Sequence, residues 1–242
     1  MALRCDLGEV ITAMVTPFDE ERNVDYNSLE KISRHLIEQK TDAVVVAGTT
    51  GESPTLTHEE EQEILLCVKS TVAGQAKVVM GAGSNCTKTA IDSSIKAQEL
   101  GADAILSVVP YYNKPSQQGL IEHFSAIAKS VDLPIILYNI QGRTGIDMKP
   151  ETIAFLAKEY KNIVAVKQSN GNLDLISEIK SLCPDDFAIY SGDDSLTLPM
   201  LSIGAHGVVS VASHVVGSEI KSMIRNYKSG QVLAASNMHR IL

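Results

Sequence analysis

The sequence is poor in aromatic residues and in positive charge. Of its 242 residues only 5% are Phe, Trp or Tyr, and tryptophan is absent. Sites for single-stranded nucleic acid stack bases on aromatic rings, so this composition argues against such a site. Lys and Arg number 21 against 29 Asp and Glu, which gives a formal net charge of -8. A chain this acidic lacks the positive charge that a phosphate backbone requires, and no nucleic-acid partner is expected.

Long apolar runs and cysteine pairs are also missing. No stretch approaches the roughly 18 apolar residues of a membrane span. The segment Met1–Asp6 has no apolar core like that of a signal peptide. The four cysteines lie far apart and form no C-x-x-C motif, so neither a disulfide framework nor a zinc site is expected. We therefore expect a reduced, cytoplasmic protein with no membrane partner.

Metal-ligating patterns are equally scarce. The six histidines form no H-x-x-x-H pair. The adjacent carboxylates of Asp193 and Asp194 have no histidine beside them in the sequence, and helix N-capping is the favoured role for them. No metal site is expected, and a metal-dependent aldolase is disfavoured.

What the sequence does contain is a regular alternation of short apolar runs and amphipathic segments, with 44% hydrophobic residues overall. Runs of this kind, rich in β-branched residues, are typical of parallel strands covered on both faces. The runs are Val10–Val15, Ala43–Val46, Val78–Met80, Ala104–Val109, Ile135–Tyr138, Ile163–Val166, Phe187–Tyr190 and Val208–Val211. Eight strands alternating with helices favour a (β/α)8 TIM barrel of the α/β class, with an open doubly wound sheet as the alternative.

Helix signals lie between the runs. Thr57 and Glu60 have the spacing of a capping box, and Pro150 suits the first position of a helix. The interval Ser218–Leu242 is expected to be helical, and Gly230 fits a helix end. We expect residues 1–230 to form the barrel.

Glycine-rich and hydroxyl-rich loops follow several runs, where barrel enzymes carry their chemistry. The loop Gly48–Ser53 is either a carboxylate cradle built from two threonines or, the favoured interpretation when it is taken alone, a plain glycine turn. Gly81–Cys86 has cysteine where a dinucleotide fingerprint needs glycine, and is expected to be a structural turn. Tyr111 and Tyr112 serve either packing or hydrogen bonding. Arg143 is either a carboxylate clamp or a solvated surface residue.

The most informative residue is Lys167, which follows the apolar run Ile163–Val166. A lysine at the mouth of a buried strand is desolvated, which lowers its pKa. A neutral amine can attack a keto carbon and form a Schiff base. In isolation, a lysine that extends to solvent at a strand end is the simpler interpretation.

Taken together, the strand-end motifs are similar to those of the dihydrodipicolinate synthase family, within the pyruvate-dependent Schiff-base lyase superfamily. The motifs are Gly48-Thr49-Thr50-Gly51-Glu52, Tyr111-Tyr112-Asn113-Lys114-Pro115, Tyr138-Asn139, Gly142-Arg143-Thr144-Gly145, Lys167 and Ser191-Gly192-Asp193-Asp194. The resemblance covers nearly the whole chain. It implies a (β/α)8 barrel and 4-hydroxy-tetrahydrodipicolinate synthase activity, in which pyruvate condenses with L-aspartate 4-semialdehyde in diaminopimelate and L-lysine biosynthesis.

The resemblance also implies roles for individual residues. Lys167 matches the Schiff-base nucleophile and Tyr138 the proton-relay tyrosine. Thr50 matches the threonine that links this tyrosine to Tyr112, which reaches in from a neighbouring subunit of a dimer or tetramer. Thr49 matches the residue that binds the pyruvate carboxylate. No cofactor is expected, because the protonated imine is itself the electron sink.

Further substrate-binding positions and some departures follow from the same comparison. Arg143 matches the residue that holds the semialdehyde carboxylate, and Gly192 and Val209 match other substrate-binding positions. Gln141 stands where the family usually has proline, which affects how Arg143 is presented. Gln168 replaces the acidic residue common after the lysine.

A site for feedback inhibition by lysine is matched only in part. Glu61 and Thr89 stand where lysine-inhibited members have a histidine and a glutamate, so weak or absent inhibition is expected. The residues that do match this possible allosteric site are Ser53, His58, Asn85 and Tyr111.

The C-terminal part departs most from the family. Residues 231–242 match only the start of a helical segment that helps tetramer packing in family members. Two alternative functions therefore remain: an aldolase of the N-acetylneuraminate lyase type or for another 2-keto acid, and a non-catalytic truncated barrel. Arg143 and the pair Thr49-Thr50 favour the synthase over the sialate lyase.

Overall fold

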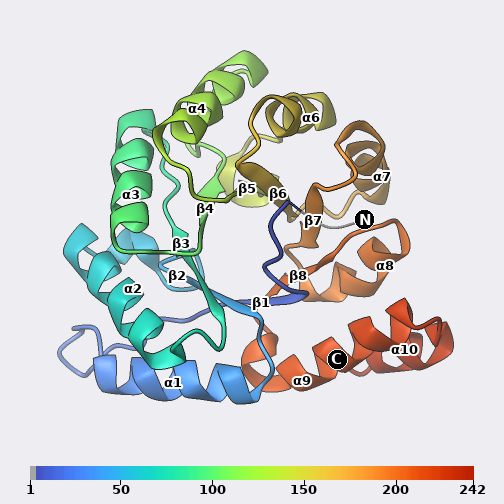
Figure 1. Cartoon of the computed structure of the whole chain (residues 1–242), viewed down its shortest axis with the longest axis horizontal. Helices are drawn as coiled ribbons and strands as arrows, with labels where there is room; N and C mark the ends of the chain where they lie inside the picture. Colours follow the sequence, from blue (N-terminus) through green and yellow to red (C-terminus); the bar gives the residue numbers. More distant parts are fainter. Residues whose placement is uncertain (1–3) are drawn as a thin grey trace.

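Eight parallel strands close into a barrel in which each strand pairs with the next and β8 pairs with β1 (Figure 1). The computed structural model describes residues 4–242, so the first three residues of the predicted barrel segment lie outside the description. The strands are β1 (Val10–Ala13), β2 (Ala43–Val46), β3 (Lys77–Gly81), β4 (Ala104–Val108), β5 (Ile135–Asn139), β6 (Ile163–Gln168), β7 (Ala188–Ser191) and β8 (Gly207–Ser210). The pairing of Val10 with Val208 closes the barrel, which confirms the TIM barrel and excludes the open sheet.

Helices surround the barrel (Figure 1). They are α1 (Tyr26–Glu38), α2 (His58–Val72), α3 (Thr87–Glu99), α4 (Gln117–Ser130), α5 (Gln141–Thr144), α6 (Pro150–Glu159), α7 (Leu173–Leu182), α8 (Thr197–Ser202), α9 (Ser213–Lys228) and α10 (Val232–His239), with 3₁₀ turns η1 (Ser53–Thr55) and η2 (Asp194–Leu196). The predicted capping box is present, because the Thr57 hydroxyl accepts from the Glu60 N–H and Glu60 accepts from the Thr57 N–H. Pro150 opens α6 as predicted.

Two apolar layers stabilise the barrel. One fills the interior and includes Ile11, Tyr138, Tyr190 and Val209. The larger one lies between the strands and the helices. Because both faces of the strands are covered, their apolar runs are continuous rather than alternating.

The segment predicted as helix over Ser218–Leu242 differs in the structure. α9 begins earlier, at Ser213, and ends at Lys228, and α10 is a separate helix. Gly230 adopts a φ of 83°, a left-handed conformation that suits glycine and ends the helix. The helix end predicted at Gly230 is therefore confirmed, whereas a single helix over Ser218–Leu242 is not.

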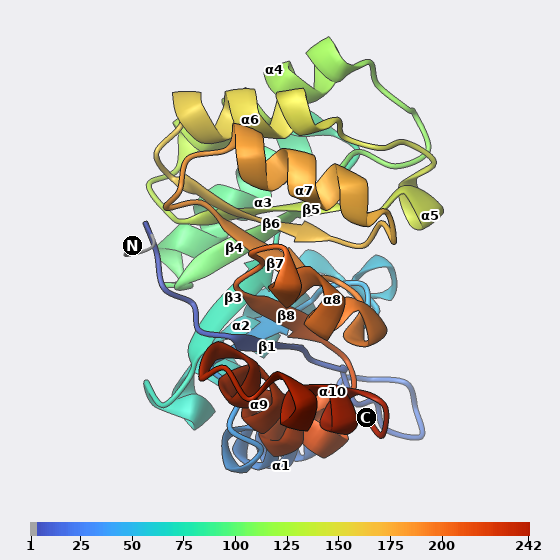
Figure 2. The ribbon, with the colours of Figure 1, turned by 90° about the vertical axis from the view of Figure 1, so that its right-hand side faces the viewer.

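The ends of the barrel are distinct. Figure 2 shows the start of the described chain at one end and α5 at the other. Since α5 directly follows β5, the end with α5 is where the carboxyl ends of the strands and their loops meet. Within residues 4–242 no helix is both long and apolar enough to cross a membrane.

Candidate active site

Lys167 lies inside the barrel mouth. It belongs to β6 rather than following it, pairs in register with Tyr138 of β5, and is only 6% exposed. Its Nζ lies 4.1 Å from the centroid of the Tyr138 ring. The interpretation as a solvent-reaching lysine is therefore wrong, and the amine shares a small space with a phenol.

Burial changes the acidity of this amine. Desolvation lowers the pKa of Lys167 from 10.5 to about 8. The negative charge of Asp194 opposes this shift, while the positive charge of Arg143 adds to it. Near neutral pH a useful fraction of the amine is therefore unprotonated and able to act as a nucleophile.

Tyr138 is the second buried group of the site. Desolvation raises the pKa of its phenol, whereas the Ser169 hydroxyl, the Arg143 charge and the Thr49 hydroxyl lower it. Two hydroxyls and a guanidinium thus favour the phenolate against the effect of burial. The phenol lies within reach of groups that can exchange protons with it.

One of the two threonines of the loop after β2 lies close to the phenol. Thr50 was expected beside the phenol, but the hydroxyl that influences Tyr138 belongs to Thr49. Gly51 fixes this loop, because its carbonyl accepts from the Thr16 hydroxyl at 2.7 Å. A Cβ at this glycine would lie only 3.0 Å from the Met14 carbonyl oxygen.

Gly192 makes room for the lysine. A Cβ at this position would lie 3.0 Å from Cε of Lys167 and would collide with Ser169. Val209, another expected substrate-binding residue, is 2% exposed and lines the interior. The acidic pair behaves as predicted for Asp193, whose carboxylate accepts from Ser195 and caps η2.

Arg143 lies on the short helix α5 and is exposed, yet its charge reaches both Lys167 and Tyr138. Near Arg143, a pair of hydrogen bonds that the sequence did not suggest holds the end of β5 in place. Asp147 accepts from Asn139 at 2.7 Å and from Asn170 at 2.8 Å. This carboxylate ties the loop after β5 to the loop after β6, so both loops are fixed around the mouth.

Tyr112 is not part of the site within one chain. Its side chain is 89% exposed, and its φ of 70° lies in the left-handed region, which is costly for a bulky residue. Tyr111 is 41% exposed. The structure therefore presents Tyr112 to the outside rather than to its own Lys167.

A second hollow adjoins the mouth. A cavity of about 270 Å³ is lined by Tyr138 and Thr49 of the mouth and also by Ser53, His58 and Tyr111. Asn85 is absent from the lining residues among those described, although its carbonyl accepts a hydrogen bond from Asn113 of the same loop region as Tyr111. Three of the four expected allosteric residues thus surround one space.

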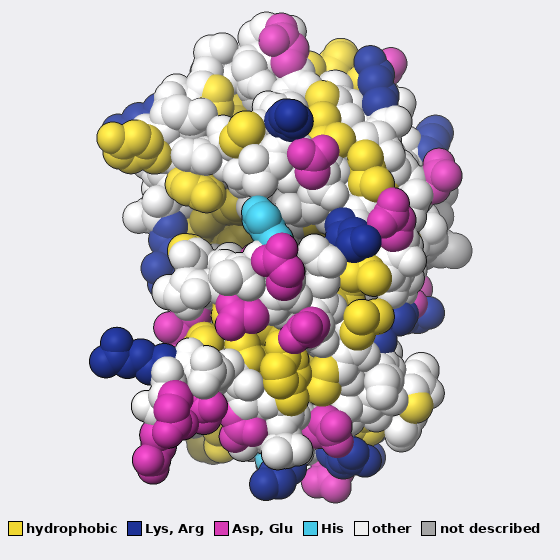
Figure 3. All heavy atoms as spheres, turned by 90° about the vertical axis from the view of Figure 1, so that its left-hand side faces the viewer, with side chains coloured by type: hydrophobic (Ala, Val, Ile, Leu, Met, Phe, Trp, Pro, Cys, Tyr) yellow, Lys and Arg dark blue, Asp and Glu magenta, His cyan; other side chains and the backbone are white. Residues whose placement is uncertain are grey.

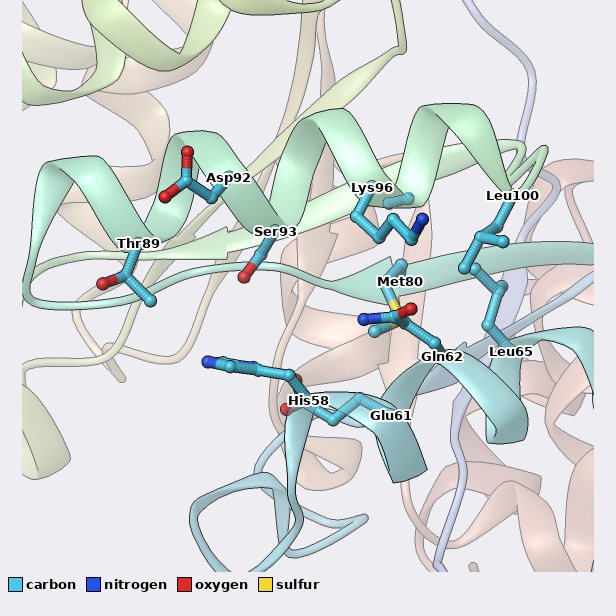
Figure 4. Close-up of a pocket in the computed structure, with 11 residues that line it drawn as sticks. His58, Glu61, Gln62, Leu65, Met80, Thr89, Asp92, Ser93, Lys96 and Leu100 are labelled. Atoms are coloured by element: carbon cyan, nitrogen blue, oxygen red, sulfur yellow. The ribbon is translucent and has the colours of Figure 1, made fainter.

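This space continues into a groove of about 250 Å³ between α2 and α3. In Figure 4, Met80 forms its floor, while His58 and Glu61 face Thr89 across it. Figure 3 shows this side of the molecule hollowed, with hydrophobic side chains at the bottom and a histidine at the edge. Burial raises the pKa of Glu61, which is hydrogen-bonded to Nδ1 of His58 at 3.0 Å.

Over the part of the chain that the structure describes, no group of three or more His, Cys, Asp and Glu side chains is arranged to hold a metal ion. The site is therefore made of an amine, a phenol, hydroxyls and a guanidinium.

Many known proteins are similar to this chain in sequence and in fold. The chain is 55% identical over 235 residues to the 4-hydroxy-tetrahydrodipicolinate synthase of Cyanothece sp., covering 97% of this chain and 80% of that protein. The crystal structure of DHDPS from Cyanidioschyzon merolae with lysine bound superposes with a TM-score of 0.95 at 53% identity, covering 96% and 80%. The synthase of Methylacidiphilum fumariolicum gives a TM-score of 0.95 at 43% identity, covering 97% and 78%.

The sequence model of the Dihydrodipicolinate synthetase family matches residues 6–242, which is nearly all of the described chain. The chain therefore belongs to the dihydrodipicolinate synthetase family.

Proposed function

We propose that this chain is a 4-hydroxy-tetrahydrodipicolinate synthase, a lyase that condenses pyruvate with L-aspartate 4-semialdehyde in the diaminopimelate route to L-lysine. The observation that carries the proposal is the Lys167 amine, which is buried and has a pKa lowered to about 8 beside a phenol. Relatives named for this activity, at 52% to 55% identity, support it.

The first step is imine formation. The neutral Lys167 amine attacks the keto carbon of pyruvate, a C–N bond forms, and the keto oxygen leaves as water once it has received protons. Tyr138 supplies and recovers these protons, and its burial supports this role because the phenol stays protonated at neutral pH. Thr49 passes protons to and from the phenol, a role that we move from Thr50 because of the proximity described above.

The second step forms a carbon–carbon bond. The protonated imine accepts the electron pair of a C–H bond of the pyruvate methyl group as that proton leaves. The enamine so formed attacks the aldehyde carbon of the semialdehyde, whose oxygen takes up a proton and becomes a hydroxyl. The amino group of the semialdehyde then attacks the imine carbon, which closes a ring, breaks the C–N bond to Lys167 and returns the lysine as a free amine. No metal or organic cofactor enters this scheme, since the imine supplies the electron sink.

Two carboxylate substrates require two anion sites. We assign the pyruvate carboxylate to Thr50 and the backbone N–H groups of its loop, and the semialdehyde carboxylate to Arg143. The exposed position of Arg143 supports an entry role for it. Gly192 and Val209 shape the pocket around pyruvate, which fits the close approach of Lys167 to this glycine.

A second copy of the chain can extend the hydroxyl chain at Tyr138. We propose a homodimer or homotetramer in which Tyr112 of one copy completes the hydroxyl chain of the other. Its exposure and left-handed backbone support this role, because such strain is retained where a side chain serves a function.

The organisation of the chain and its surroundings complete the proposal. We assign residues 1–230 to the catalytic barrel and 231–242 to a C-terminal helical segment, which the break at Gly230 supports. A cytoplasmic location fits the four cysteines, all of which carry free thiols. For the cavity near His58 we propose weak lysine inhibition at most.

A trapping experiment tests the function. Incubation with pyruvate and borohydride should reduce the imine and add the mass of the reduced pyruvate group to Lys167, as located by peptide mass spectrometry. Lys167→Ala should lose the adduct and the turnover, whereas the matched surface variant Lys158→Ala should keep both. Folding of each variant is checked by circular dichroism.

The alternatives give different results. An adduct without turnover of the semialdehyde, but with cleavage of a keto sugar acid, would favour an aldolase of the N-acetylneuraminate lyase type. Folded protein that forms no adduct would indicate a non-catalytic barrel and end the proposal.

A further inference from the structure

Ser169 lies in the barrel mouth although no motif pointed to it. It directly follows β6, and its N–H donates to the Asn139 carbonyl at 2.9 Å, which continues the strand pairing. In extended chain, residues two apart face the same side. The Ser169 side chain therefore points to the same side as Lys167.

The surroundings of this serine are tight. A Cβ built on Gly192 would lie 1.9 Å from Oγ of Ser169 and 3.0 Å from Cε of Lys167. The hydroxyl thus occupies space that exists only because residue 192 is glycine, and it lies against the lysine stem. Any larger residue at position 192 would displace one of the two.

The hydroxyl is buried but has no hydrogen bond of ordinary length and angle to any group within residues 4–242. Burying a polar group without a partner costs free energy, so such groups in native proteins call for an explanation. The Tyr138 phenol shares this part of the mouth, since Nζ of Lys167 lies 4.1 Å from the centroid of its ring, and the Ser169 hydroxyl lowers the pKa of this phenol. A hydroxyl that donates to a phenol oxygen stabilises the phenolate, which accounts for this direction.

We infer that Ser169 is a further positioning residue of the reaction, whose hydroxyl holds the Tyr138 phenol toward the carbon that Lys167 attacks. The inference rests on the proposed function. Ser169 acts through the phenol and takes no part in covalent chemistry. Ser169, directly after β6, and Thr49, in the loop after β2, both act on the phenol through their hydroxyls.

Other charged groups near the phenol also affect its pKa or that of Lys167. Lys167 faces Tyr138 from β6, and Arg143 faces it from α5. Asp194, from η2, acts on Lys167. Replacing Ser169 by alanine changes none of these charges, so a changed pH profile would report on the phenol.

The test is Ser169→Ala, which removes one oxygen and adds no bulk. We expect kcat to fall about tenfold, with KM for pyruvate nearly unchanged, because a proton donor that is poorly held is less efficient. We expect the alkaline decline of kcat to move to higher pH, since the phenol pKa rises when the hydroxyl is lost. The borohydride adduct on Lys167 should still form.

Ser107→Ala is the matched control. Ser107 is also a buried serine whose Oγ lacks a partner in the described chain, and it alternates on β4 with residues that face the mouth. Both variants should unfold at the same temperature as the parent or higher, but only Ser169→Ala should lose activity. An unchanged kcat and pH profile in Ser169→Ala would refute the inference, and a missing adduct in the parent chain would instead refute the proposed function.

Discussion

The reactivity of Lys167 is set by burial together with two charges of opposite sign. Desolvation lowers its pKa most, Asp194 raises it, and Arg143 lowers it. Asp194 is held in place because one carboxylate oxygen accepts from the backbone N–H groups of Val211 and Ala212. Its other oxygen is buried and has no hydrogen-bond partner among residues 4–242.

This arrangement predicts the pH dependence of imine formation. Only the unprotonated amine attacks pyruvate, so kcat/KM for pyruvate should rise with pH and level off above a midpoint of about 8, the lowered pKa of Lys167. Asp194→Asn keeps the hydrogen-bond acceptor but removes the charge that raises this pKa, so the midpoint should move to lower pH. A pH–rate profile measures both.

Asp193→Asn is the control for this shift. Asp193 caps η2 and is exposed, and its carboxylate is absent from the groups that affect Lys167 among the described residues. Its profile should match that of the parent chain. A midpoint near 10.5, the ordinary value for lysine, would contradict the burial of the amine.

Among the structural elements, α2 has the most clearly encoded start. The reciprocal hydrogen bonds of Thr57 and Glu60 give each of the two backbone N–H groups an acceptor. Thr57→Ala should lower the free energy of unfolding by about 1 kcal/mol. Denaturant unfolding measures this loss. The exposed Ser70→Ala on the same helix should change stability by less than about 0.5 kcal/mol, and an equal effect of both would show that the cap contributes nothing.

Much of this level of structure was predictable because its causes are local. Apolar runs gave the strands, and the box at Thr57 and the proline at 150 gave helix starts. The burial of Lys167 could also be expected from its position beside an apolar run. The strands and helix starts depend on neighbours within a few residues in the chain, whereas the burial of Lys167 also requires the barrel to close around it.

The features that could not be predicted from the sequence depend on which side chains of separate strands and loops face one another in the barrel. Thr49 and Thr50 are adjacent in sequence, and only the path of the loop decides which hydroxyl faces Tyr138. The Ser169 hydroxyl has room beside Lys167 only because Gly192, directly after β7, has no Cβ. The serine two residues after the lysine was a usable signal, because that spacing places it on the same face.

At the scale of the whole molecule, the mouth and the α2–α3 side are physically connected. One cavity is lined by Tyr138 and also by His58 and Glu61, and the last two residues line the groove of Figure 4 as well. A ligand in this cavity would contact Tyr138 and Thr49, which also belong to the active site. A ligand bound in the cavity can therefore affect the active site through shared residues, and the size of this effect depends on which ligand binds.

To bind in this cavity, lysine would have to place its ammonium group among the lining residues. Glu61 is poorly suited to receive it, since burial raises the pKa of its carboxyl and His58 already occupies it. Thr89, across the groove, carries no charge. We expect lysine titrations to give weak or absent inhibition, and Thr89→Glu, which adds a carboxylate facing the cavity, to increase lysine sensitivity. Initial rates and calorimetric binding measure both. Strong inhibition of the parent chain at micromolar lysine would contradict this expectation and show that the existing carboxylates are sufficient.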